Sequence, residues 1–118
     1  MANQDITSFT TRLRRFAAAR DWQQFHSPKN LAMALSVEAA EVVEHFQWLT
    51  EQQSRELSTA KREEVQLELA DVFIYLIRLS DELSVDIFAA ANKKIAINEE
   101  KYPADQVRGS AKKSTDYM

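Results

Sequence analysis

The sequence predicts an all-α fold, a bundle of four to five helices that oligomerisation completes. One Gly, two Pro and no Cys occur among 118 residues. So few helix-breaking residues favour long helices with short connections. Apolar residues recur at helical spacing in four stretches, and the third stretch is apolar around more than one face. These observations predict long helices, one of which needs a partner chain to cover it.

Length and charge limit the classes of function. The chain is expected to form one domain, small enough to gain stability from association. A net charge of -3 does not support nucleic-acid binding, which needs a basic face. No apolar run reaches the roughly eighteen residues of a membrane span, and the N-terminus lacks the apolar core of a signal peptide. We therefore expect a cytoplasmic protein that binds neither nucleic acid nor membrane.

The first helix is expected over about residues 4–20. Its apolar residues lie at helical spacing and should face the core: Ile6, Phe9, Leu13, Phe16 and Ala17. Four arginines lie mostly off this face: Arg12, Arg14, Arg15 and Arg20. They are expected to form a solvated basic edge, and a role in holding phosphate is the alternative.

An aromatic connection follows at residues 21–28. Trp22, Phe25 and His26 fall within a span of five residues. Their rings either close the end of the core or stack on a planar ligand such as a nucleobase. Ser27 followed by Pro28 is a strong start signal for a second helix, expected over about residues 28–49.

Trp48 lies near the end of this second helix, seven residues after Glu41. Seven residues are two helical turns, so Trp48 is expected on the same face as Glu41. There it either covers the mouth of a binding site or belongs to the core. Residues 50–57 are polar and are expected to form a surface connection.

The third helix is expected over about residues 58–83, with Ser58 as its N-cap. Its apolar residues occupy more than one stripe: Val65, Leu67, Leu69, Val72, Phe73, Ile74, Leu76, Ile77 and Leu79. A helix with so much apolar surface must be buried on two sides. Because the chain offers few other helices, one side is expected to meet a second copy, and a homo-oligomer is predicted.

A fourth helix is expected over about residues 87–101, with Asp86 as its cap. Its core residues are expected to be Ile87, Phe88, Ala91 and Ile95. Lys94, Asn98 and Tyr102 form a polar line along it, either a solvated face or a substrate-facing one. Residues 1–103 are expected to form the domain and residues 104–118 a flexible C-terminal tail.

Two acidic pairs lie inside the apolar patterns of the second and third helices. Glu38 with Glu41, and Glu68 with Asp71, are each spaced i, i+3, which places both carboxylates of a pair on one helix face. Unpaired carboxylates facing an apolar surface lose their hydration, so they must be neutralised, paired or bound to a cation. Four carboxylates from two antiparallel helices would form an oxygen-only cage of the kind that Mg²⁺ prefers. Solvated helix faces are the alternative. A di-iron bundle is disfavoured because its Glu-x-x-His pattern is absent: the only histidine nearby, His45, follows Glu41 by four residues.

In this order, the motifs resemble those of the MazG-like superfamily of all-α nucleoside triphosphate pyrophosphohydrolases. The family pattern is Glu-x-x-Glu on one helix and Glu-x-x-Asp on the next, which the chain matches at residues 38–41 and 68–71. Further segments are similar to the small dCTP pyrophosphatase branch: residues 20–22, 24–26, 46–48, 71–72, 74–76, 97–98 and 102–103. The resemblance covers nearly the whole chain to about Pro103.

The resemblance implies hydrolysis of a (deoxy)nucleoside triphosphate, dCTP or a modified dCTP, to the monophosphate and pyrophosphate, in nucleotide-pool house-cleaning. It implies Mg²⁺, with Mn²⁺ as a substitute, bound by Glu38, Glu41, Glu68 and Asp71. Glu41 and Glu38 are the expected catalytic residues, with Glu41 as general base. The implied substrate-binding residues are Trp22, Phe25, His26, Trp48, Tyr75, Lys94, Asn98 and Tyr102. The implied assembly is a dimer of dimers.

Two alternatives stay open. Mammalian members carry a histidine on the first helix that helps to hold the nucleotide, and this chain has Leu13 there. A dUTP or broad-specificity nucleoside triphosphate pyrophosphohydrolase is therefore the alternative within the enzyme class. From another class, the alternative is a non-catalytic helical interaction module. Such a module would have no need for four carboxylates facing its core, so the enzyme is favoured.

Overall fold

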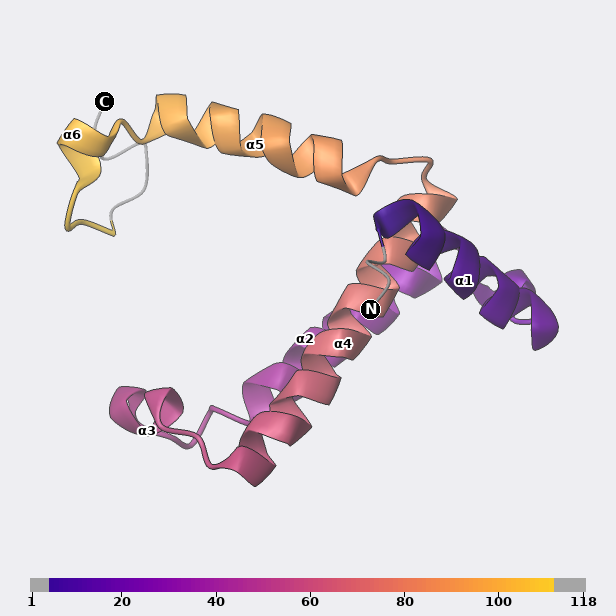
Figure 1. The fold of residues 1–118 in the computed structure, drawn as a ribbon, viewed down its shortest axis with the longest axis horizontal. Coiled ribbons are helices and arrows are strands. Elements are labelled where there is room, and N and C mark those ends of the chain that lie inside the picture. Colours follow the sequence, from indigo (N-terminus) through magenta and orange to yellow (C-terminus); the bar gives the residue numbers. More distant parts are fainter. Residues whose placement is uncertain (1–4, 112–118) are drawn as a thin grey trace. The chain divides into compact units, whose positions relative to one another are not determined.

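The computed structural model describes residues 5–111, and within this range the chain forms helices and no strands (Figure 1). The predicted all-α fold is confirmed. The helices are α1 (Ile6–Ala19), the 3-10 turn η1 (Gln23–Phe25), α2 (Pro28–Glu44), α3 (Glu51–Arg55), α4 (Thr59–Glu82), α5 (Ile87–Lys101) and α6 (Ala104–Val107). The chain divides into two compact units, one that ends at Val85 and one that begins at Asp86.

Capping side chains begin three of the helices where the sequence predicts them. The side chains of Ser27, Ser58 and Asp86 each accept a hydrogen bond from the backbone N–H three residues later, at 3.0–3.1 Å. These bonds satisfy N–H groups that have no partner within the helix. The starts of α2, α4 and α5 are therefore fixed locally.

The second helix is shorter than predicted. It ends at Glu44, and the next backbone bonds tighten, since Phe46 N–H donates to the Val43 carbonyl over three residues at 2.9 Å. Leu49 N–H donates to Phe46 in the same way, also at 2.9 Å. The predicted helix over 45–49 is wrong because the last turn becomes 3-10-like before Thr50 starts a new helix.

The polar connection at residues 50–57 contains a helix that the sequence analysis missed. Thr50 Oγ1 accepts from the Gln53 backbone N–H at 3.1 Å, and Gln53 Oε1 accepts from the Thr50 N–H at 2.9 Å. This reciprocal pair is a capping box, which starts α3. The Thr-x-x-Gln spacing is the signal that would have revealed it.

The core of the first unit forms where α1 and α2 pack on α4. Its most completely buried large side chains are Leu31 of α2 and Ile77 of α4, each 1% exposed. Ala17 and Leu13 of α1 and Val65 of α4 are also buried. The predicted apolar faces of α1 and α4 are thus confirmed at Leu13, Ala17, Val65 and Ile77, but Phe16, predicted in the core, is exposed.

Helix α5 follows its predicted bounds but does not bury its predicted core. Phe88 and Ile95 are exposed, and no residue of α5 is buried within the chain. A single helix turn, α6, opens the predicted tail, whose last residues, 112–118, lie outside the described range. The flexible tail stays a prediction. Within residues 5–111, no helix combines the length and apolar character that crossing a membrane requires.

Candidate functional site

Helices α2 and α4 bring three of the predicted metal ligands together. One carboxylate oxygen from each of Glu38, Glu41 and Glu68 lies within 4.8 Å of the other two. All three side chains are half-buried. The helices run antiparallel, because His45, just after α2, lies near Glu64 and Glu68 early in α4, whereas His26, just before α2, lies near Arg78 late in α4. The predicted meeting of two acidic helix faces is therefore present in the fold.

Mutual repulsion and burial raise the pKa of two of these carboxyl groups. Burial, followed by the neighbouring Glu41, raises the pKa of Glu38 to about 7. Proximity to Glu41, followed by burial, raises the pKa of Glu68. Among the described residues, Oε2 of Glu38 and Oε2 of Glu68 are buried without a hydrogen-bond partner. Native proteins seldom leave such atoms unsatisfied, so a cation or a proton is needed here.

Asp71 lies beside this cluster, outside the set of three converging oxygens. Its charge nevertheless raises the pKa of both Glu38 and Glu68. A modest side-chain rotation toward a cation would therefore be favoured by charge. The donor set of Glu38, Glu41, Glu68 and Asp71 consists only of oxygen, which fits a hard divalent cation such as Mg²⁺ and not a soft one.

His45 is a neighbour of the cluster that the sequence analysis considered only as part of a missing di-iron pattern. Its Nε2 lies 3.9 Å from Glu68 Oε1, and its Nδ1 lies 4.0 Å from Glu64 Oε2. It follows Glu41 by four residues, and this spacing on one helix face could have identified it. His45 thus places an imidazole ring at the end of the acidic cluster.

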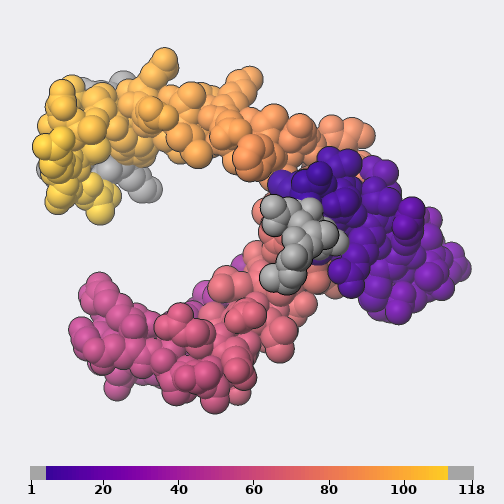
Figure 2. Space-filling view, viewed as in Figure 1, coloured from indigo at the N-terminus to yellow at the C-terminus, as the bar shows by residue number. Residues whose placement is uncertain are grey.

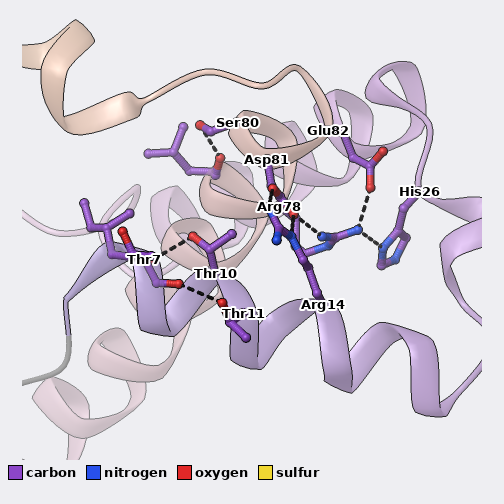
Figure 3. Close-up of polar contacts among 11 residues, drawn as sticks. Thr7, Thr10, Thr11, Arg14, His26, Arg78, Ser80, Asp81 and Glu82 are labelled. Carbon is purple, nitrogen blue, oxygen red and sulfur yellow. Dashed lines mark hydrogen bonds and ion pairs between the residues drawn. The ribbon is translucent and has the colours of Figure 1, made fainter.

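A second polar network lies further along α4, and the sequence analysis did not predict it (Figure 3). Arg78 is 3% exposed and donates to Asp81 at 3.1 Å and to Glu82 at 2.9 Å. Arg14 of α1 donates to both Asp81 oxygens, with Nε to Oδ2 at 2.8 Å. These partners, Arg14 first, lower the pKa of Asp81. Arg14 is exposed, as its expected place on a solvated edge requires, and it also joins α1 to α4.

The aromatic connection at residues 21–28 is held against α1 by a defined helix end. Trp22 N–H donates to the Ala17 carbonyl at 2.9 Å and Asp21 N–H to Ala18 at 3.1 Å, with Asp21 in the left-handed region at φ 55°. This is a Schellman motif. It sets the Trp22 ring edge-on to Phe16, with centroids 5.7 Å apart. The connection therefore has a fixed conformation.

The three predicted base-binding rings of this connection differ in their surroundings. Trp22 and Phe25 are exposed, and His26 is half-buried. His26 Nδ1 lies 3.4 Å from Arg78. Burial, followed by the charge of Arg78, lowers the pKa of His26. The lowered pKa favours the neutral form of His26, while the other two rings offer accessible faces.

The remaining predicted substrate residues lie in the turn after α2, on α4 and in the second unit. Trp48 is 87% exposed in the turn after α2, so its expected place on the Glu41 face is wrong because the helix has already ended. Tyr75 is half-buried on α4, four residues after Asp71. Lys94 and Asn98 of α5, with Tyr102 at its end, belong to the second unit. They keep the predicted i, i+4 and i+8 spacing within that unit.

Comparison with known proteins places the chain in a family. A model of the MazG-like family matches residues 33–117. The dCTP pyrophosphatase 1 of Homo sapiens is 44% identical over 103 residues, which are 86% of this chain and 61% of that protein. The Mus musculus protein of the same name is 45% identical over an equal share. The chain thus spans 61% of the length of these curated relatives.

A solved structure agrees in fold. A pyrophosphatase from Archaeoglobus fulgidus superposes with a TM-score of 0.80 at 36% identity, over 87% of this chain and 96% of that one. The family match covers well over half of the chain and includes all four acidic residues of the predicted cage. From these similarities, and from the paired acidic helices that α2 and α4 form, we conclude that the chain belongs to the MazG-like family.

Proposed function

We propose that this protein hydrolyses a deoxynucleoside triphosphate, dCTP or a modified dCTP, to the monophosphate and pyrophosphate, with Mg²⁺ as its cofactor. The observation that carries the proposal is the convergence of Glu38, Glu41 and Glu68 within 4.8 Å, with two buried oxygens that lack partners among the described residues. The names of the curated relatives support the substrate, and family membership supports the reaction. A role in clearing unwanted nucleotides follows from this activity, and a cytoplasmic location stays a prediction.

The acidic cluster explains why a divalent cation is needed. A triphosphate would be repelled by Glu38, Glu41, Glu68 and Asp71 unless positive charge lay between them. Bound there, Mg²⁺ would supply that charge, and Mn²⁺ is the expected substitute because it also accepts oxygen ligands. Glu41 and Glu38 are the proposed catalytic residues. Glu41, which is central in the cluster, would accept a proton from the attacking water. Glu38 would remain a ligand of the metal ion.

The base and sugar would be held by side chains beyond the acids. The proposed contacts are Trp22, Phe25, His26, Trp48, Tyr75, Lys94, Asn98 and Tyr102. The exposed faces of Trp22 and Phe25 support stacking on the base, since stacking tolerates any nucleobase. Discrimination between bases would then require hydrogen bonds from a side chain such as His26.

The competing substrate preference is a dUTP or broad-specificity one. It is favoured by Leu13, which is buried in α1 and offers no hydrogen bond where mammalian relatives have histidine. Pyrophosphate release from each common dNTP and NTP, with Mg²⁺ and with EDTA in parallel, tests both. Metal-dependent release led by dCTP is expected. Release led by another nucleotide would support the alternative, and no release from any would favour a non-catalytic interaction module.

We further propose a homo-oligomer, a dimer of dimers, as the working assembly. Large apolar side chains of α4 are exposed within the chain, with Leu67 at 69% and Leu69 at 53%. The space-filling view shows much of α4 at the surface of the first unit (Figure 2). Covering these side chains would stabilise the fold by removing apolar area from water.

A further inference from the structure

Arg78 makes contacts that reach beyond its own helix. Its guanidinium donates to Asp81 and Glu82 on α4 and faces His26 Nδ1 at 3.4 Å. With Arg14 on Asp81, the network contains two positive and two negative side chains. The four charges balance without any charge on His26. The imidazole therefore needs no charge of its own, and it reaches the network from the aromatic connection (Figure 3).

The chemistry of Arg78 decides which nitrogen of His26 carries the proton. A guanidinium has five donors, no acceptor and never loses its charge at physiological pH. Its contact on His26 Nδ1 can be attractive only if Nδ1 is an acceptor, so the proton must lie on Nε2. A protonated imidazole would instead set two donors and two positive charges against each other. The lowered pKa of His26 agrees with a neutral ring.

The ring is held in this place from the backbone as well. His26 N–H donates to the Gln23 carbonyl at 3.1 Å, which closes the 3-10 turn. Asn30 Nδ2 of α2 donates to the carbonyl of Phe25 at 2.9 Å. The peptide between Phe25 and His26 is therefore tied through its N–H to the 3-10 turn and through its carbonyl to α2. A fixed backbone and a fixed tautomer together define the direction of the remaining Nε2–H donor.

Arg78 also continues the face of α4 that carries the acids. Glu68, Asp71, Tyr75 and Arg78 follow one another at spacings of three, four and three residues, which place them on one helix face. Ten residues separate Glu68 from Arg78, about 15 Å along the helix axis. A nucleotide whose phosphates lie at the acids could therefore extend along this face, past Tyr75, toward His26.

We propose that Arg78 is a positioning residue that locks His26 in the Nε2–H tautomer, so that His26 presents one hydrogen-bond donor to the base of the nucleotide. The second half of this inference rests on the proposed function; the first half does not. A single donor suits a carbonyl oxygen or a ring nitrogen on a pyrimidine edge. The predicted stacking rings supply affinity for any base, and the His26 donor supplies selection among them.

The tautomer can be measured without any turnover. The chain contains two histidines, so the imidazole nitrogens of His26 can be assigned in ¹⁵N-labelled protein by comparison with a His26→Gln variant. Long-range ¹H–¹⁵N correlation at neutral pH should show His26 with a protonated Nε2 and a bare Nδ1. A protonated Nδ1, in either a neutral or a charged ring, would overturn the proposal.

Variants of Arg78 test whether this residue sets the tautomer of His26. In Arg78→Met the two His26 tautomers should mix, whereas Arg78→Lys should keep Nε2–H because an ammonium group also only donates. Arg62→Met, which removes an exposed arginine near the start of the same helix, is the matched control and should leave the spectrum unchanged. Unchanged His26 signals in Arg78→Met would show that Arg78 does not set the tautomer.

Kinetics test the contact with the base. The KM for the preferred nucleotide should rise about tenfold in Arg78→Met, the equivalent of one lost hydrogen bond, with kcat changed less than twofold. Arg78→Lys should recover most of the loss. In the His26→Phe background, Arg78→Met should raise KM little further, because no imidazole donor is left for Arg78 to orient. A fall in kcat alone, or fully additive effects, would contradict the positioning role.

Failure of the two proposals can be told apart. In one outcome, no nucleotide is hydrolysed, but His26 shows the Nε2–H tautomer and loses it in Arg78→Met. The proposed function and the base contact are then wrong, while the inference that Arg78 sets the tautomer is correct. If nucleotides are hydrolysed and His26 carries its proton on Nδ1, the lock is wrong and the proposed function stands. Circular dichroism of each variant confirms that it is folded.

Discussion

At the scale of single residues, Glu41 governs the electrostatics of the acidic cluster. Its carboxylate contributes to the raised pKa of Glu38 and is the largest cause of the raised pKa of Glu68. Both neighbours are half-buried, so water screens the repulsion only in part. The same charge that weakens the metal-free fold is the one that would attract a divalent cation.

Glu41→Gln should abolish pyrophosphate release and stabilise the metal-free protein. The amide keeps the size of the side chain but removes the central negative charge, so repulsion falls and cation binding weakens. We expect a higher Tm in EDTA and a smaller rise in Tm on adding Mg²⁺. Thermal unfolding in both conditions measures this. Glu44→Gln, an exposed glutamate on the same helix, is the control. Near wild-type activity in Glu41→Gln would remove Glu41 from the catalytic role.

The raised pKa of Glu38 predicts a pH dependence of stability. Its pKa rises from 4.5 to about 7 on folding. Below about pH 4.5 the group is protonated in both states and its stabilising contribution is complete; as pH rises through 7 the contribution is lost. In EDTA, the Tm of the wild type relative to the Tm of Glu38→Gln should therefore fall as the pH rises from 4.5 to 7.5. A difference that stays flat across this range would show that folding does not raise the pKa of Glu38.

At the scale of elements, two helices within residues 5–111 are followed by a non-glycine residue in the left-handed region. Helix α1 is followed by Asp21 at φ 55° and α4 by Ser84 at φ 56°. In each case two backbone bonds close a Schellman motif, with Val85 N–H donating to the Ser80 carbonyl at 2.8 Å after α4. Glycine usually fills this position, and a side chain there is strained.

Ser84→Gly should stabilise the protein by about 0.5–1 kcal/mol. The change removes the left-handed strain, which outweighs the entropy that glycine gains in the unfolded chain. Urea unfolding, at equal protein concentration for all variants, measures the effect. Ser84→Val is the comparison and should destabilise the protein, since a β-branched side chain fits this conformation poorly. Equal midpoints for the two variants would show that the α4 end is not strained.

At the scale of the whole molecule, exposed apolar side chains of α4 predict association. Light scattering after size exclusion should give a mass that is a multiple of the 13.6 kDa chain, with four chains as the expected number. Leu67→Glu should lower this mass, because a charge would be buried at the contact. Glu63→Gln, also exposed and one turn earlier on α4, should not change it. A wild-type mass of one chain would contradict the proposed assembly.

The sequence alone determined the features that depend on local chemistry. Serine and aspartate caps mark the starts of α2, α4 and α5, because a side-chain oxygen three residues before an N–H satisfies it within one turn. The i, i+3 spacing sets Glu38 with Glu41 on one face of a helix, because helix geometry is fixed. The all-α fold and the acidic cluster were therefore predictable.

Only the tertiary structure decided which residues meet. The axial register of α2 against α4 makes Glu41 the neighbour of Glu68 and leaves Asp71 beside the cluster, and helical periodicity carries no information about register. Backbone hydrogen bonds that span three residues end α2 after Glu44, so Trp48 does not continue the helix face of Glu41. The contact between Arg78 and His26 joins residues 52 positions apart. Such contacts depend on how helices pack, and packing is set by the whole core.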